Sequence, residues 1–140
     1  MKILVAADGS SYTKHMLAYL AAHEDWLGPA HQYTVVHCTP RVPPRAAAYF
    51  GGDALGSYYR DESEKVFKPI RTFFKRHGME VSFSGKVGHA AEAIASLADK
   101  GKFDLLVMGS HGHGALGSMV MGSVVTKVLA TCKTPLLIVR

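Results

Sequence analysis

The sequence predicts an open, doubly wound α/β fold in which a five-stranded parallel sheet is covered by helices on both faces. Short apolar segments alternate with segments of helical periodicity along the chain, which is the order of βαβ units. Most of the apolar segments are apolar throughout, which indicates strands that are buried on both sides. The chain has 140 residues, and we expect residues 1–140 to form a single domain.

The first half of the chain opens with a predicted strand, helix and strand. The strand, residues 2–7, stops at the turn and helix-capping cluster Asp8–Ser11. Apolar residues then recur at helical spacing until Gly28 breaks the pattern. Residues 33–38 are β-branched and apolar, which predicts the second strand.

A long segment, residues 39–57, follows and is predicted to be irregular because it is rich in proline and glycine. A loop of this length in a compact domain is usually functional or mobile. A lid over a ligand, a partner surface and a passive connector all remain open. From residue 58 to 77 the spacing predicts a helix, and Pro69 inside it is expected to kink it or divide it in two.

The second half of the chain continues the alternation of strands and helices. Residues 79–87 and 103–108 are predicted strands, separated by a helix over residues 90–100 that Gly101 ends. A helix over Gly122–Thr131 and a final strand over residues 134–139 complete the fold.

The most informative segment is the glycine-rich loop from Gly109 to Ser123, which follows the predicted strand 103–108. Glycines let the backbone approach an anion closely and permit positive φ. Exposed backbone N–H groups and the positive end of a following helix then form an anion site. Open α/β sheets bind ligands at the carboxyl ends of strands, so the loop predicts phosphate binding through the backbone. Ser123 is expected to cap the helix and to offer its hydroxyl to a phosphate.

Other phosphate-binding and catalytic motifs do not fit this loop. No Lys-Ser/Thr pair follows the glycines, which excludes a P-loop. Gly112-x-Gly114-x-x-Gly117 spells GxGxxG, but it follows the fourth strand and lacks an acidic residue about 20 positions on, which disfavours a dinucleotide fold. No GxSxG nucleophile elbow occurs.

The spacing Gly109-x2-Gly112-x9-Gly122-Ser123 matches every fixed position of the nucleotide-binding signature of the universal stress protein family, which the chain resembles. Residues 2–10, 104–110 and 134–139 are similar to the same family. The resemblance implies the ATP-binding branch, an adenine nucleotide α-hydrolase-like sheet of strand order 3-2-1-4-5, and a homodimer. It also implies ATP, or ADP or AMP, as the ligand, with Mg²⁺ held mainly by the phosphates.

Carried over by position, the resemblance implies a set of nucleotide-binding residues. Ala6 and Asp8 are expected beside the adenosine, with the Asp8 carboxylate directed at the ribose or the base, and Cys38 in the adenine pocket. The remaining residues are expected along the ribose and phosphates: Gly109, His111, Gly112, His113, Gly114, Gly122, Ser123 and Val124. Cys38 stands where an aliphatic residue is common, and Ala6 where some members have proline. Asp8 has an alternative role as a helix N-cap.

The expected function is that of a regulatory or signalling module, which acts through nucleotide-dependent conformation or partner binding. A slow ATPase or nucleotide-dependent transferase is one alternative, and a dimeric interaction module that does not need nucleotide is another. Efficient hydrolysis needs a base and a metal-holding carboxylate, and Asp8 is the only obvious carboxylate, so no catalytic residue is assigned. The final strand would be an exposed edge, and we expect it to pair with its symmetry mate in the homodimer.

The composition of the chain bears on nucleic-acid binding, membrane association and metal binding. The net charge of +5 comes from scattered basic residues, which indicates a solvated surface and no nucleic-acid partner. No apolar run reaches the ~20 residues of a membrane span, and no signal peptide is evident, so we expect no membrane association and a cytoplasmic location. Cys38 and Cys132 form no metal-binding spacing, and His111 and His113 alone do not make a metal site.

Overall fold

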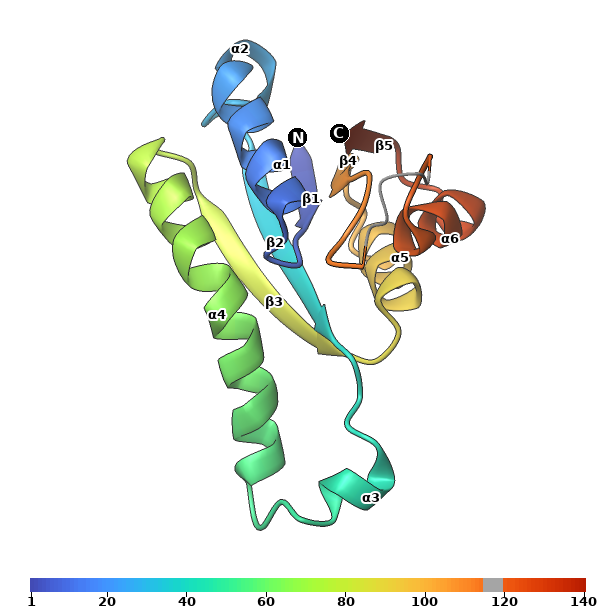
Figure 1. Cartoon of the computed structure of the whole chain (residues 1–140). Helices are drawn as coiled ribbons and strands as arrows, with labels where there is room; N and C mark the ends of the chain where they lie inside the picture. The colour runs from blue at the N-terminus through green and yellow to red at the C-terminus, as the bar shows by residue number, and fades with distance from the viewer. Residues whose placement is uncertain (115–119) are drawn as a thin grey trace.

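The structure, a computed structural model, describes residues 1–114 and 120–140. Strands and helices alternate along the chain as the sequence predicts, and Figure 1 labels them. The strands are β1 (Lys2–Ala6), β2 (Gln32–Thr39), β3 (Val81–Val87), β4 (Leu105–Gly109) and β5 (Leu136–Val139). The helices are α1 (Ser11–Ala22), α2 (Glu24–Leu27), α3 (Pro44–Ala47), α4 (Ala54–Arg76), α5 (Ala90–Lys100) and α6 (Ser123–Thr131).

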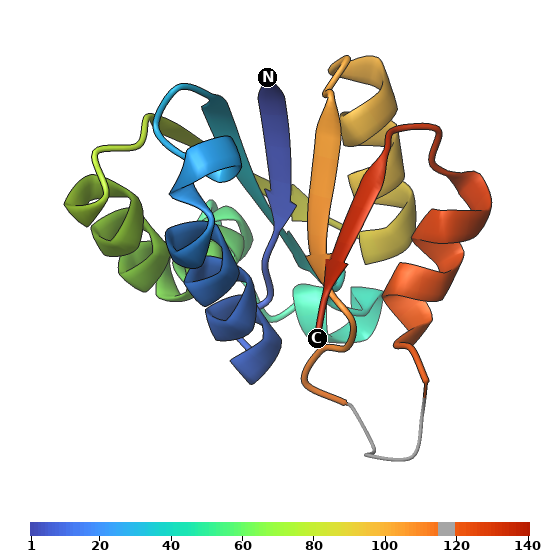
Figure 2. The ribbon, with the colours of Figure 1, turned by 90° about the horizontal axis from the view of Figure 1, so that it is seen from above.

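The five strands form one parallel sheet in the order β3-β2-β1-β4-β5, which confirms the predicted fold and strand order. Helices cover both faces, with α1 and α4 on one side and α5 and α6 on the other (Figure 2). Alternate residues of β1 serve the two cores: Ile3 and Val5 pack under α1 and α4, and Leu4 and Ala6 under α5 and α6. Such a strand is buried on both faces, which is why the residues of β1 form a continuous apolar run.

The order of the strands reverses beside β1. The chain crosses from β1 to β2 and β3 on one side and then returns to β4 and β5 on the other. Connections leaving β1 and β4 therefore diverge, and an open crevice forms between them at the carboxyl ends of the strands. This topological switch point places the turn after β1 opposite the glycine-rich loop after β4.

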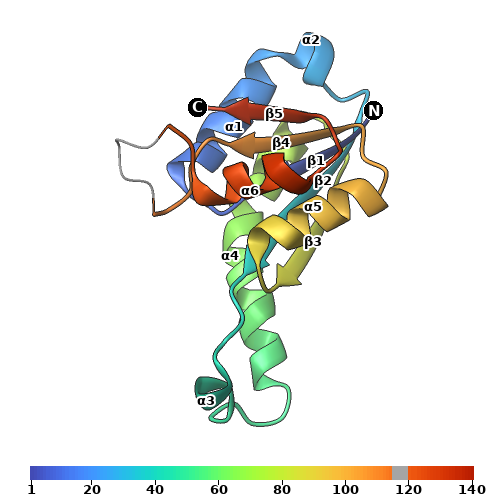
Figure 3. The same ribbon diagram turned by 90° about the vertical axis from the view of Figure 1, so that its right-hand side faces the viewer.

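The segment 39–57 is more ordered than the sequence predicts. It contains the short helix α3, and α4 begins at Ala54, four residues before the predicted start at residue 58. The start of α4 and the whole of α3 extend beyond the edge of the sheet (Figure 3). The backbone N–H of Val42 donates to the hydroxyl of Tyr59 at 2.8 Å, which ties the incoming chain to the helix.

Helix α4 runs without interruption through Pro69, so the predicted break does not occur. Proline removes the hydrogen bond to the carbonyl of the residue four positions earlier, here Lys65. Both Pro69 and Lys65 lie on the exposed side of the helix, where water can bond to that carbonyl. Buried Phe67 and Phe74 hold the helix against the sheet on either side of the proline.

At the amino ends of the strands, Asp99 fastens the turn that precedes β5. Its carboxylate accepts hydrogen bonds from the backbone N–H of Lys133 at 3.1 Å and from that of Thr134 at 3.0 Å. The Thr134 hydroxyl donates to the same carboxylate at 2.8 Å, and the Cys132 thiol lies 3.4 Å from it. These donors favour the ionised form, led by the Lys133 amide, and lower the pKa of Asp99.

In the part of the chain that the structure describes, no helix is long and apolar enough to cross a bilayer. The longest helix, α4, carries charged side chains along its length, including Glu64, Lys65 and Arg71.

Candidate nucleotide-binding site

A cavity of about 440 Å³ opens at the carboxyl ends of the strands, at the switch point beside β1. Its volume lies within the range of about 300–1,000 Å³ that is usual for small-molecule sites. The structure brings every binding residue predicted from the sequence to its wall. These residues are Ala6, Asp8, Cys38, Gly109, His111, Gly112, His113, Gly114, Gly122, Ser123 and Val124.

Further residues line the same cavity and were not predicted from the sequence. They are Ala7, Tyr12, Thr13, Met16, Val36, His37, Pro40, Ala90, Ile94, Met108 and Val125. Most of them are apolar residues at core spacing, and a sequence does not show which core residues border a void. For Thr13 a weak signal was available, because this hydroxyl residue follows the capping cluster Asp8–Ser11 by two positions.

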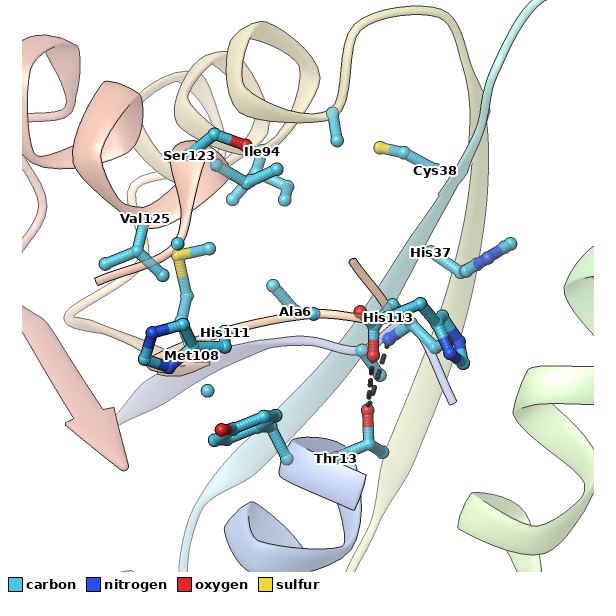
Figure 4. Close-up of a pocket in the computed structure, with 18 of the residues that line it drawn as sticks. Ala6, Thr13, His37, Cys38, Ile94, Met108, His111, His113, Ser123 and Val125 are labelled. Atoms are coloured by element: carbon cyan, nitrogen blue, oxygen red, sulfur yellow. Dashed lines mark hydrogen bonds between the residues drawn. The ribbon is translucent and has the colours of Figure 1, made fainter. Parts of the chain in front are cut away.

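Apolar side chains form one part of the cavity wall. Ile94 from α5, Met108 from β4 and Val125 from α6 lie together on one side, with Cys38 of β2 and His37 farther across (Figure 4). Burial raises the pKa of the Cys38 thiol against an opposing effect of Lys86, so the thiol stays protonated at neutral pH. Cys38 therefore serves as a small apolar group, which fits a flat, apolar part of a ligand.

Close packing requires several of the glycines in the loop after β4. A Cβ on Gly109 would lie 2.7 Å from the Cβ of Tyr12, and one on Gly112 would lie 2.6 Å from Oδ2 of Asp8. Neither glycine has a left-handed φ, nor do Gly114 and Gly122. Positive φ is therefore not the reason for glycine at these four positions. Close approach of neighbouring groups is the physical reason at Gly109, Gly112 and Gly122, whereas a Cβ on Gly114 would meet open space.

Hydrogen bonds hold the described ends of this loop in place. Ser110 N–H donates to the carbonyl of Val139 at 2.8 Å, and Gly122 N–H donates to the carbonyl of Ser110 at 2.7 Å. His113 Nε2 lies 2.7 Å from the carbonyl oxygen of Asp8. A carbonyl only accepts, so Nε2 carries the proton and links the loop to the turn after β1. Gly117 of the GxGxxG pattern lies outside the described residues.

Helix α6 begins at the cavity. Gly122 occupies the N-cap position, and Ser123 is the first helical residue, with no side-chain bond that caps the helix. The prediction that Ser123 caps α6 is therefore wrong. Its residues Ser123 and Val124 line the cavity, so the positive end of the helix dipole lies beside it, where an anion is stabilised.

Asp8 does not cap α1, because Ser10 occupies the N-cap position. Its Oδ1 instead accepts a hydrogen bond from the backbone N–H of Ser10 at 2.9 Å and one from the hydroxyl of Thr13 at 3.2 Å. The bond to Ser10, two residues on, is an Asx turn. Oδ2 faces Gly112.

Two histidines on different elements add polar groups near Asp8. His37 is half-buried, and its Nδ1 is hydrogen-bonded to Ser63 Oγ at 3.1 Å, as expected for a histidine in a buried strand. Burial lowers the pKa of His37, while the charges of Asp8 and Glu62 oppose that effect and nearby His113 adds to it. Among the residues that the structure describes, no three His, Cys, Asp or Glu side chains are grouped to hold a metal ion.

The cavity, its glycine-spaced rim and its place beside β1 agree with one family of proteins. The sequence model described as the universal stress protein family matches residues 1–140. The chain belongs to the universal stress protein family. A universal stress protein of Thermus aquaticus is 33% identical over 146 residues, covering 99% of this chain and 97% of the relative. Universal stress protein Slr1230 of Synechocystis is 31% identical over 139 residues, and this chain spans only 42% of its length.

Solved structures share the fold of this universal stress protein. Protein MJ0577 of Methanocaldococcus jannaschii superposes with a TM-score of 0.79 at 23% identity, covering 99% of this chain and 94% of that one. A family member from Arabidopsis thaliana with AMP bound has a TM-score of 0.71 at 14% identity, covering 99% and 90%. The universal stress protein of Archaeoglobus fulgidus in complex with dAMP has a TM-score of 0.63 at 18% identity, covering 100% and 98%.

Proposed function

We propose that this universal stress protein binds an adenine nucleotide, with ATP as the ligand, in the cavity at the carboxyl ends of the strands. The observation that carries the proposal is the division of the cavity wall. Apolar groups such as Ile94 and Met108 line one part, and the glycine loop with the start of α6 lines another. A base and a polyphosphate need such a pair of surfaces, one apolar and one rich in backbone N–H groups.

The likeness to family members with bound AMP and dAMP supports an adenine nucleotide as the ligand class. In this proposal the Asp8 carboxylate accepts a hydrogen bond from the ribose, and Gly109, Gly112 and Gly122 border the phosphates. Asp8 is the carboxylate in the described lining. A single carboxylate already used for the ribose leaves Mg²⁺ to coordinate mainly the phosphate oxygens.

We further propose that nucleotide binding regulates a partner or a conformation, since the described lining carries one carboxylate where rapid hydrolysis needs a base and a metal ligand. A slow ATPase is the alternative, and phosphate release measured over hours with the purified protein distinguishes the two. Release that is abolished by Gly112→Ala would favour the enzyme.

Calorimetric titration with ATP tests the binding proposal. We expect saturable binding of one ATP per chain, weakened about tenfold or more in Gly112→Ala, because the added Cβ forces the Asp8 carboxylate to move. Gly51→Ala is the matched control, since a Cβ there has open space, φ is ordinary, and residue 51 is not part of the cavity lining. Absence of binding at millimolar ATP, or equal affinities of both variants, would contradict the proposal.

A homodimer through β5 is the second part of the proposal. β5 pairs only with β4 and forms one edge of the sheet, so its outer backbone groups have no strand partner among the described residues. Pairing of two β5 strands would cover these edges. Sedimentation analysis should give a dimer, and Ile138→Pro, which removes an outward-facing backbone donor from the edge strand, should shift it toward monomer. A wild-type monomer at high concentration would contradict this part.

A further inference from the structure

The turn between β1 and α1 contains a buried hydroxyl with an unusual set of contacts. Thr13 lies in the first turn of α1 and is 4% exposed. Its Oγ1 lies 3.2 Å from the backbone N of Asp8 and 3.1 Å from that of Gly9, both of which donate to it. Its third neighbour is Oδ1 of Asp8, at 3.2 Å. Figure 4 labels Thr13 and marks its hydrogen bonds to Asp8 by dashed lines.

The direction of the third bond follows from the chemistry of a hydroxyl. A threonine hydroxyl has two acceptor positions and one proton. The N–H groups of Asp8 and Gly9 occupy both acceptor positions, so the proton points to Oδ1 of Asp8. The hydroxyl then has no donor or acceptor left for a ligand, although Thr13 lines the cavity.

The two oxygens of the Asp8 carboxylate differ in their hydrogen-bond partners. Oδ1 receives two donors, the Thr13 hydroxyl and the backbone N–H of Ser10. Oδ2 has no hydrogen-bond partner among residues 1–114 and 120–140, and it faces Gly112 at the rim of the cavity. Rotation of the carboxylate would break both bonds to Oδ1, so the turn fixes which oxygen is left for a ligand.

We infer that Thr13 is a positioning residue that selects ribose over deoxyribose by holding Oδ2 of Asp8 toward the cavity as an acceptor for a sugar hydroxyl. The inference rests on the proposed function, because it assumes that a nucleotide occupies the cavity. Thr13 acts through Asp8 and does not itself touch the nucleotide.

The decisive measurement is the ratio of the dissociation constants for 2′-deoxy-ATP and ATP, determined by calorimetry on the same protein sample. Partial unfolding lowers the apparent affinity of the protein for both nucleotides by the same factor, so the ratio is insensitive to loss of stability. A hydrogen bond to a charged group predicts a ratio of about tenfold for the wild type. Thr13→Val should reduce the ratio to about one, and Thr13→Ser, which keeps the hydroxyl, should retain it.

A matched control is available on α4. Thr72 carries an exposed hydroxyl that bonds only to the carbonyl of Lys68 in its own helix. Thr72→Val deletes the same hydroxyl away from the cavity and should leave the ratio unchanged. Should Thr13→Val not fold, Thr13→Ala leaves room for water beside the amides of Asp8 and Gly9, and the ratio should fall in that variant as well.

The outcomes separate the inference from the proposed function. If the wild type binds neither nucleotide, the proposed function fails and the inference fails with it. If ATP binds but the wild-type ratio is about one, or if the ratio survives in the hydroxyl-free variant of Thr13 that folds, nucleotide binding stands and the positioning role is overturned. A ratio lost in Thr13→Val and restored in Thr13→Ser supports it.

Discussion

Two aspartates at opposite ends of the sheet hold turns in different ways. Asp99, at the amino ends of the strands, accepts hydrogen bonds on both carboxylate oxygens from the turn before β5. Asp8, at the carboxyl ends, accepts both of its hydrogen bonds on Oδ1, and Oδ2 faces Gly112 at the rim of the cavity. Asp99 is thus saturated by the protein itself, whereas Asp8 is fixed in direction and keeps one oxygen for something else.

The two ends of the sheet thus differ in what a carboxylate contributes, stability at one end and binding at the other. A carboxylate whose oxygens are all satisfied within the chain contributes to folding and offers little to a ligand. A carboxylate held by one oxygen is already oriented, so a ligand that bonds to the other loses less freedom of the site on binding. Variants of Asp8 and Asp99 test this division.

The largest effect is expected from Asp8→Ala. Loss of a charge-assisted hydrogen bond to the ribose should weaken ATP binding by about tenfold to a hundredfold. The melting temperature of the Asp8→Ala variant should fall less than that of Asp99→Ala, because only the hydrogen bonds to Ser10 and Thr13 are lost from the fold. Calorimetric titration and thermal unfolding measure the two quantities. An ATP affinity equal to that of the wild type would remove Asp8 from the site.

The reverse pattern is expected for Asp99→Ala. The turn at Lys133 and Thr134 loses its acceptor, so the melting temperature should drop while the ATP affinity of the folded protein stays within about twofold of the wild type. Asp61→Ala, at an exposed position of α4, serves as the control for removal of a carboxylate. A large loss of ATP affinity in Asp99→Ala would show that the two ends of the sheet are coupled.

A smaller effect concerns acid stability. The pKa of Asp99 is lowered in the folded protein, so its contribution is fully present above the ordinary carboxyl pKa and is lost as the pH falls through the folded value. The difference in free energy of unfolding between wild type and Asp99→Asn should therefore be constant above about pH 5 and shrink below it. Urea titrations at a series of pH values measure it. A difference that is independent of pH would contradict the assigned hydrogen bonds.

The smallest effect is on the titration of His37. Burial lowers the pKa of this histidine, and the charge of Asp8 opposes the lowering. Removal of that charge in Asp8→Ala should lower the pKa of His37 further, while Asp99→Ala should leave it unchanged. NMR titration of the imidazole signals measures both. Equal pKa values in all three proteins would show that Asp8 and His37 do not interact.

Much of the fold could be predicted from the sequence because each element carries a local signal. The continuous apolar run of β1 predicts a strand that is buried on both faces. The family is indicated by the spacing of Gly109, Gly112 and Gly122. Prediction from the sequence failed where contacts between residues far apart in the chain determine the structure. Pro69 predicts a break, yet its exposed position and the buried phenylalanines around it keep α4 whole.

The cavity shows the same limit. The residues predicted from the glycine spacing and the family resemblance all line it, but the physical reasons differ from those expected. Gly112 avoids the Asp8 carboxylate, and Ser123 does not cap α6. Thr13 escaped prediction because its contact with Asp8 exists only once the left-handed Gly9, with φ of 78°, has turned the chain back on itself.

An NMR titration of the ¹⁵N-labelled protein with ATP tests most directly whether the cavity is a nucleotide site. The backbone N–H signals of Gly109, Gly112 and Gly122 should move and saturate with the largest shifts in the chain, while those of Lys133 and Thr134 at the far end should stay in place. If none of the three glycine signals moves at millimolar ATP, or if the largest shifts fall at the end of the sheet held by Asp99, the cavity is not the binding site.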